Sequence, residues 1–155
     1  MAGRTGFRRV LLGLDGSPHS RRATLFLARL RPPRGGQVTC VRVVEPARVP
    51  SMPLVPGRLR AKVTAQAAAS NRSRVAIAQS QVDAAVTRLT RAGWRARGAV
   101  RLGVPLAGLL ATARAARADL LVVGARGAGA VTHFLLGSVA EALVKHGPVP
   151  VLVVK

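Results

Sequence analysis

The sequence contains little cysteine and few aromatic residues, and both shortages limit what it can be. Cys40 is the only cysteine, which excludes a disulfide framework and a cysteine-based zinc cluster. Aromatic residues make up only 3% of the chain, so the core has to be built from valine, leucine and alanine. This composition favours an α/β protein with a parallel sheet over a sandwich or a barrel with aromatic corners.

Long apolar runs are also missing. No run approaches the roughly 20 residues that a membrane-spanning helix needs, so we expect no membrane partner. The first residues are basic but pass directly into a strand-like segment that ends at Asp15, which is not the pattern of a signal peptide. We therefore expect a cytosolic protein.

Acidic residues are scarce as well. The chain has 5 of them against 25 basic residues, of which all but three are arginines, and its net charge is +20. Such a charge fits a surface that binds nucleic acid or other anions. The arginines, however, are spread over every segment and lack the interleaved aromatic residues that stack on bases. We therefore expect salt-sensitive, non-specific adhesion to polyanions rather than specific nucleic-acid binding.

Apolar periodicity divides the chain into alternating strands and helices. The predicted strands are 10–14, 38–44, 94–101, 120–123 and 149–154, and the predicted helices are 18–30, 58–92, 105–117 and a last one from 138. A proline-rich loop, 46–57, separates the second strand from the longest helix, and 94–101 reads as an edge strand. The alternation predicts one domain, 1–155, with a parallel sheet and helices on both faces.

The most informative stretch is Asp119 to Ser138. A buried strand ends at Gly124, and Gly127 and Gly137 follow, the latter directly before Ser138, which begins a helix. Glycines let backbone N–H groups come close to a ligand, and a helix start adds unpaired donors, so this order is typical of a phosphate-binding loop. The alternative is a tight β-α connection that holds no ligand.

A second polar turn, Asp15-Gly16-Ser17, follows the first strand. Ligands of open α/β sheets lie beyond the carboxyl ends of the strands, where the strand order reverses. If the first and fourth strands are neighbours, this turn faces the glycine segment across a cleft. Ser17 also fits the cap position of the next helix, with Pro18 as its first residue.

The glycine spacing, G-x2-G-x9-G-[S/T], resembles the nucleotide-binding branch of the universal stress protein family. It is neither a Walker A loop nor a G-x-G-x-x-G fingerprint. The segments VLLGLDGS, VVEP, DLLVVGARG and GPVPVLVV also follow the family order. The resemblance implies an open five-stranded parallel sheet in the order 3-2-1-4-5. It also implies binding of ATP or a related adenine nucleotide, and a homodimer that pairs the last strand, Val151–Val154.

The resemblance further implies a set of nucleotide-binding residues. Carried over position by position, they are Gly13, Asp15, Val43, Val123, Gly124, Arg126, Gly127, Gly137, Ser138 and Val139. The chemistry agrees, because a carboxylate accepts hydrogen bonds from ribose, a serine hydroxyl donates to phosphate, and arginine binds phosphate in a bidentate manner. Gly13 departs from the family, where a bulkier residue is common, so we expect a looser pocket wall there. His133 reads as a solvated loop histidine, with a phosphate contact as the alternative.

Catalytic residues are hard to find among the five carboxylates. Only Asp15, and after it Glu45, suits a ligand site. Phosphoryl transfer needs metal ligands and a group that positions the nucleophile. Asp15 alone can hold Mg²⁺ through water, but we identify neither a second ligand nor a base, and Cys40 reads as a small buried hydrophobe. We expect a nucleotide-binding regulatory protein of the stress response. The alternatives are a weak Mg²⁺-dependent ATPase and a polyanion-binding protein with a vestigial glycine loop.

Overall fold

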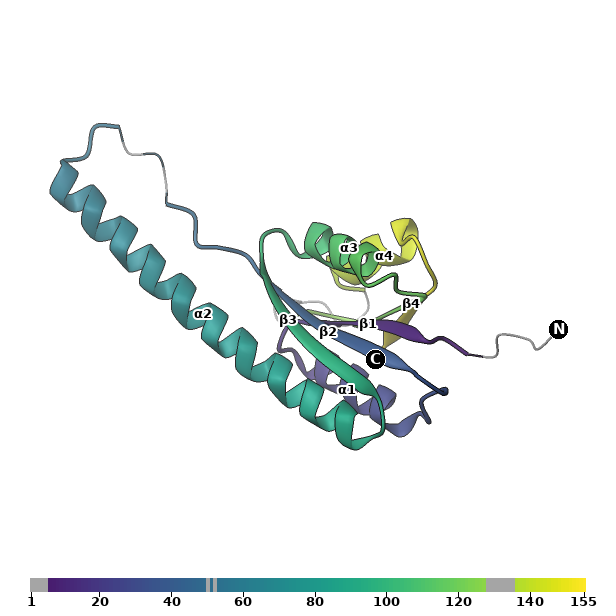
Figure 1. The fold of residues 1–155 in the computed structure, drawn as a ribbon. Helices are drawn as coiled ribbons and strands as arrows, with labels where there is room; N and C mark the ends of the chain where they lie inside the picture. The colour runs from purple at the N-terminus through teal and green to yellow at the C-terminus, as the bar shows by residue number, and fades with distance from the viewer. Residues whose placement is uncertain (1–5, 50, 52, 128–135) are drawn as a thin grey trace.

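The computed structural model describes residues 6–49, 51, 53–127 and 136–155, in which strands and helices alternate (Figure 1). In chain order they are β1 (Arg9–Leu14), α1 (Pro18–Arg29), β2 (Gln37–Val44), α2 (Gly57–Arg91), β3 (Arg95–Leu102), α3 (Pro105–Ala115), β4 (Leu120–Gly124), α4 (Ser138–His146) and β5 (Val151–Val154). Every predicted element is present, with ends shifted by one or two residues. Within the described residues no helix is both long and apolar enough to cross a membrane.

The strands form one parallel sheet in the order β3-β2-β1-β4-β5, which confirms the predicted order. β1 pairs with β4 through partners such as Val10 with Leu120 and Leu12 with Val122. The first and fourth strands are therefore neighbours, and the strand order reverses between them. β3 and β5 are the two edge strands, so the prediction of an edge strand near 94–101 is also confirmed.

Helices cover both faces of the sheet (Figure 1). On one face α1 and α2 pack on a core cluster that includes Leu12, Leu27 and Leu89. On the other face α3 and α4 pack on a second cluster, which includes Leu109, Leu121 and Leu143. The central strands are buried on both faces because each is covered twice, which explains why β1 and β4 read as unbroken apolar runs.

Local signals fix several of the boundaries. The Ser17 hydroxyl accepts a hydrogen bond from the backbone N–H of Ser20 at 3.1 Å, and Pro18 opens α1, as the sequence predicts. Gly93, at φ +93°, follows the end of α2. α3 ends two residues earlier than expected, and Arg117 adopts a left-handed φ of 48° just after it. β5 begins only after Pro150, whose ring nitrogen cannot donate to a strand partner.

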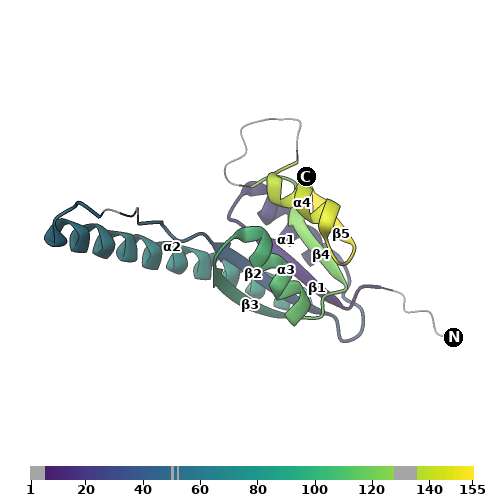
Figure 2. The same cartoon turned by 90° about the horizontal axis from the view of Figure 1, so that it is seen from above.

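The long helix α2 reaches well beyond the sheet. Its first buried residue is Ala78, so the turns before it project from the body as an arm (Figure 2). The chain leaving β2 is tied to this arm by two hydrogen bonds. The N–H of Ala47 donates to Asn71 Oδ1 at 2.7 Å, and Arg74 Nη1 donates to the carbonyl of Glu45 at 3.0 Å. Positions 50 and 52 of the proline-rich loop lie outside the described residues.

Candidate functional site

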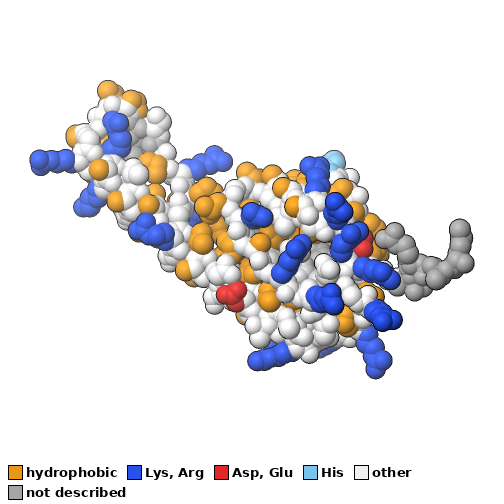
Figure 3. Space-filling model, in the orientation of Figure 1, with side chains coloured by type: hydrophobic (Ala, Val, Ile, Leu, Met, Phe, Trp, Pro, Cys, Tyr) orange, Lys and Arg blue, Asp and Glu red, His pale blue; other side chains and the backbone are white. Residues whose placement is uncertain are grey.

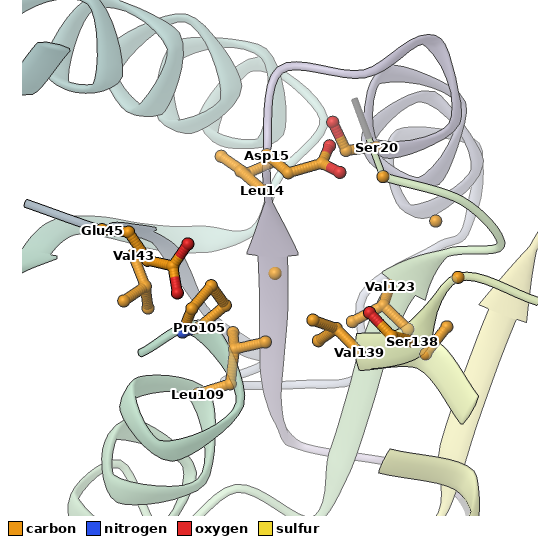
Figure 4. Close-up of a pocket in the computed structure, with 15 residues that line it drawn as sticks. Leu14, Asp15, Ser20, Val43, Glu45, Pro105, Leu109, Val123, Ser138 and Val139 are labelled. Atoms are coloured by element: carbon orange, nitrogen blue, oxygen red, sulfur yellow. The ribbon is translucent and has the colours of Figure 1, made fainter. Parts of the chain in front are cut away.

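A cavity of about 490 Å³ opens at the carboxyl ends of β1, β2 and β4, where the strand order reverses (Figure 4). Nine of the ten residues predicted for the site line it: Gly13, Asp15, Val43, Val123, Gly124, Gly127, Gly137, Ser138 and Val139. They come from β1, β2, β4 and the start of α4, so segments more than 100 residues apart in the chain meet around one space. The remaining lining residues are Leu14, Ser20, Glu45, Pro105, Leu109 and Ala140.

The Asp15 turn and the glycine segment lie side by side along one edge of this cavity, in direct contact rather than across a cleft. Asp15 Oδ1 accepts a hydrogen bond from the N–H of Ser17 at 2.8 Å, which fixes the carboxylate. Its other oxygen lies close to Gly127, where a Cβ atom would stand only 3.0 Å from Oδ2. Ser17 Oγ in turn donates to the backbone carbonyl of Arg126 at 3.1 Å. The two turns are thereby tied together, as the neighbouring positions of β1 and β4 require.

The glycine segment closes on itself at its two ends. The N–H of Gly137 donates to the carbonyl of Ala125 at 2.8 Å. A Cβ atom on Gly137 would lie 3.2 Å from the nitrogen of Gly127, so a side chain here would require the neighbouring backbone to shift by a few tenths of an ångström. Ser138 then begins α4, and Gly137, the cap residue of that helix, has no side chain to occupy its first N–H groups. Residues 128–135, which include His133, lie outside the described residues.

The opposite side of the cavity is mostly apolar, with Glu45 at its border. Val43 at the end of β2 faces it together with Pro105 and Leu109 of α3 (Figure 4). Helix α3 approaches β2 closely because residue 108 is glycine, whose Cβ would lie 2.7 Å from Cγ2 of Val43. The contribution of α3 to the cavity was not predicted from the sequence. It could have been inferred from the rule that ligands bind beyond the carboxyl ends of the strands. Helix α3 follows β3, so its first residues lie at that same edge of the sheet.

Gly13 forms part of the floor between β2 and β4. The expected looser wall is not what the structure shows, because two neighbouring side chains take up the room that a larger residue would need. A Cβ atom at this position would stand 3.0 Å from Val123 Cγ1 and 3.1 Å from Leu109 Cδ2. Val123 and Leu109 therefore fill the space beside Gly13, and a larger residue there would require both side chains to shift.

Two carboxylates border the cavity. Glu45 stands on the side of Val43 and Pro105, and Asp15 stands at the end of β1 (Figure 4). From the sequence, Glu45 was the second choice after Asp15 for a carboxylate at the ligand site. Its position directly after β2, at the carboxyl edge of the sheet, already indicated that it lies near the cavity. Arg126 is not among the lining residues, and its predicted contact with phosphate stays a prediction. Within the described part of the chain, no three histidine, cysteine or acidic side chains gather as a metal site.

The groups with displaced pKa values lie elsewhere. Burial raises the pKa of the Cys40 thiol from 9.0 to about 12, so this side chain stays neutral and is a poor nucleophile. A hydrogen bond from Lys145 lowers the pKa of Glu141 on the exposed face of α4. Neither residue lines the cavity. What the cavity offers is therefore hydrogen-bond donors at one side, apolar surface at another, and two carboxylates.

Comparison with known proteins places this arrangement in a family. Residues 6–155 match the Universal stress protein family. The chain is 32% identical over 150 residues to the universal stress protein in the QAH/OAS sulfhydrylase 3′ region of Thermus aquaticus, with 96% of this chain and 99% of that one covered.

Two solved structures share the fold. The structure of the protein MJ0577 superposes with a TM-score of 0.80 at 20% identity, covering 96% of this chain and 95% of that one. A universal stress protein solved in complex with cAMP superposes with a TM-score of 0.65 at 24% identity, covering 97% and 98%. The matched sequence, the sheet order and the glycine spacing agree, and the chain is a member of the universal stress protein family.

Proposed function

We propose that the chain binds an adenine nucleotide, ATP in the first place, in the cavity at the ends of β1, β2 and β4. The observation that carries the proposal is the division of this cavity into two chemically different sides. Gly127, Gly137 and Ser138 form one side, and Val43 with Leu109 forms the other. A nucleotide has the same division, with a charged phosphate end and a flat base. The relative in complex with cAMP supports an adenine nucleotide in this fold.

Each predicted residue has a role in this proposal. The phosphates accept hydrogen bonds from N–H groups at the start of α4 and from Ser138 Oγ. Asp15 accepts hydrogen bonds from the ribose hydroxyls through Oδ2. This oxygen lies beside Gly127, whereas Oδ1 accepts the hydrogen bond from the N–H of Ser17. The base lies against Val43, and Arg126 adds a charged contact to phosphate. The remaining positions give shape to the pocket, namely Gly13, Val123, Gly124 and Val139.

A weak Mg²⁺-dependent ATPase is the second candidate function. The observation that favours it is the presence of both Asp15 and Glu45 at one cavity. Mg²⁺ keeps most of its waters and binds proteins through one or two carboxylates together with substrate phosphates, so these residues fit the ion. Phosphate release from ATP should then require Mg²⁺ and be lost in Asp15→Ala. A turnover that survives this change would count against the candidate.

The regulatory role rests on the assembly as well as on the site. We propose a cytosolic homodimer that pairs β5 with its copy across a two-fold axis. All four residues of Val151–Val154 are only half-buried, and an apolar edge strand left open is prone to association. Nucleotide occupancy is then the signal that the dimer presents to other proteins in the stress response.

Calorimetric titration tests nucleotide binding directly. ATP with Mg²⁺ is titrated into protein stripped of nucleotide, at high salt, because a chain with net charge +20 attracts any triphosphate. We expect one-to-one binding that persists in salt and is abolished by Gly127→Val with Ser138→Ala. The valine fills the space beside Asp15 Oδ2, and the alanine removes the hydroxyl at the start of α4.

The contrary outcome is equally defined. Weak binding that is equal in the two proteins and disappears in salt would show that ATP is only a polyanion to this chain. The glycine loop would then be vestigial, and the arginine-rich surface would carry the function. Melting curves of the double variant without nucleotide serve as the control, since a folded variant is needed to assign the loss to the site.

A further inference from the structure

The edge strand β3 carries different residues on its two faces. Ala96 and Val100 pack into the core cluster beneath α1 and α2. The alternate positions Arg95, Arg97 and Arg101 point to the opposite face, since successive side chains of a strand alternate. All three arginines are exposed. Apart from the half-buried Ala99, this face of β3 is thus a row of arginines.

This face is open to solvent. Helix α3 packs mainly over β2 and β1. On this face of β3, Ala99 packs against the cluster beneath α3 and α4, while the three arginines stay exposed. Figure 3 shows Lys and Arg side chains gathered over the part of the molecule where β3 and α3 lie. Arg97 is held in place, because its Nε donates to Thr39 Oγ1 of β2 at 3.0 Å.

The row has no acidic counterpart. Residues 84–118 contain no aspartate or glutamate. Within the described residues, none of the three arginines of β3 forms an ion pair with a carboxylate. Like charges at alternate positions of a strand repel one another, so the row costs stability unless an anion neutralises it.

A simpler explanation for the three arginines is that they protect the edge of the sheet. A charged residue on an edge strand prevents unwanted strand pairing, and lysine serves this purpose most often. The chain instead uses arginine three times, and the planar guanidinium binds phosphate in a bidentate manner. From Arg95 to Arg101 the row spans about 20 Å at 3.3 Å per residue. At about 3.4 Å per base pair, this is the length of roughly six pairs of duplex DNA.

We propose that this arginine row binds the phosphate backbone of a nucleic acid duplex, without reading its sequence. Bases of a duplex are turned inward and need no stacking partner, whereas a single strand favours aromatic platforms. The nearest aromatic residue, Trp94, is buried and donates its Nε1–H to the carbonyl of Leu27, so the row offers no stacking surface. Contacts of this kind position a protein on the backbone and specify no sequence.

The salt dependence of binding tests the proposal. Binding of a labelled 20-base-pair DNA duplex is measured between low and physiological salt, without nucleotide, so that the outcome does not depend on the ATP site. The variant carries Arg95→Gln, Arg97→Gln and Arg101→Gln. Each phosphate contact contributes about 0.9 to the slope of log K against log salt, so we expect the slope to fall by about 3.

A matched control separates the row from the overall charge. Arg22, Arg29 and Arg88 are exposed on α1 and α2, on the other face of the sheet. Changing these three to glutamine removes the same charge, and we expect the slope to fall by about 1 at most, through the weaker long-range field. Circular dichroism of both variants checks the fold. Slower amide exchange along β3 on addition of the duplex gives a second readout, in the unmodified protein.

Four results would overturn the proposal. The first is an equal loss of slope in the two triple variants, and the second is no binding of the duplex by the unmodified protein at low salt. The third is tighter binding of a single strand of equal length with the same dependence on the row. The fourth is row-dependent binding of phosphatidylserine vesicles with no effect of the row on DNA, which would identify a membrane surface as the partner.

Discussion

Among the described residues, a backbone N–H group holds Asp15 at the site. Its Oδ1 accepts from the N–H of Ser17 at 2.8 Å, and the same Ser17 caps α1 and reaches the carbonyl of Arg126. One serine therefore orients the carboxylate, begins a helix and ties the two turns of the site. Ser17, which reads in the sequence as a cap residue alone, therefore also shapes the proposed nucleotide site.

The buried thiol of Cys40 leads to a prediction about pH. Its pKa is raised from 9.0 to about 12 by burial, so the folded protein keeps the thiol neutral after the unfolded chain has ionised it. The contribution of the neutral thiol to the free energy of unfolding is complete below about pH 9 and is lost as the pH rises toward 12. At pH 10, one unit above the unfolded value, the loss is about 1.4 kcal/mol.

Urea unfolding at pH 8 and pH 10 measures this loss. Cys40→Ala removes the titrating group, so we expect its stability to fall less than that of the unmodified protein between the two pH values. The variant is less stable at both, because Cys40 is fully buried. Equal falls in the two proteins would show that the thiol does not contribute.

At the scale of elements, glycine sets how closely helices approach the sheet. Gly98 of β3 lies under α2, and a Cβ atom there would stand only 2.3 Å from Val82 Cγ1. In the sequence, Gly98 stands inside the predicted edge strand 94–101. The structure shows the reason for the glycine, because a close approach between backbone and helix needs a residue without a side chain.

Gly98→Ala should therefore destabilise the fold by about 1–3 kcal/mol, the usual effect of overpacking. Chemical unfolding measures the change. Gly57→Ala is the control, since nothing lies within 4 Å of a Cβ atom at that position, and we expect it to be close to neutral. Val82→Ala combined with Gly98→Ala should recover part of the loss, and strictly additive losses would contradict the proposed contact.

The two halves of the site differ in how far the sequence predicts them. Ser17 with Pro18 and the glycines at 124, 127 and 137 act through local backbone rules, so their positions could be predicted. On the apolar side Val43 was predicted, whereas Pro105 and Leu109 were not, because they reach Val43 only through the packing of α3 on β2. That packing depends on the close contact of Gly108 with the side chain of Val43, 65 residues earlier in the chain. A contact between residues so far apart cannot be predicted from a local sequence pattern.

At the scale of the whole molecule, the two edges of the sheet differ in character. β3 is arginine-rich and its exposed row repels a second copy, whereas β5 is made of valine and leucine. An antiparallel pair of β3 strands would bring like charges together, while β5 strands have apolar side chains to bury. We therefore expect self-association at β5 and anion contacts at β3.

The hydrogen-bond pattern of β5 identifies the residue to change. The N–H of Leu121 donates to the carbonyl of Pro150, and that of Ala125 donates to Val154. Alternate residues of a parallel strand bond to the same neighbour, so positions 150, 152 and 154 face β4. The N–H and C=O groups of Val151 and Val153 consequently point away from the sheet, toward the proposed partner strand.

Val153→Pro should convert the dimer into a monomer. Proline removes the outward N–H of this residue and leaves the ladder to β4 intact, and edge strands tolerate proline. Val153→Thr is the matched control, because it keeps the N–H and the branched shape. Sedimentation velocity at micromolar concentration should give a dimer for the unmodified protein and for Val153→Thr. A dimer that persists in Val153→Pro would place the interface elsewhere. A monomeric unmodified protein would contradict the homodimer. In either case the open edge of β5 would not be what brings two copies together.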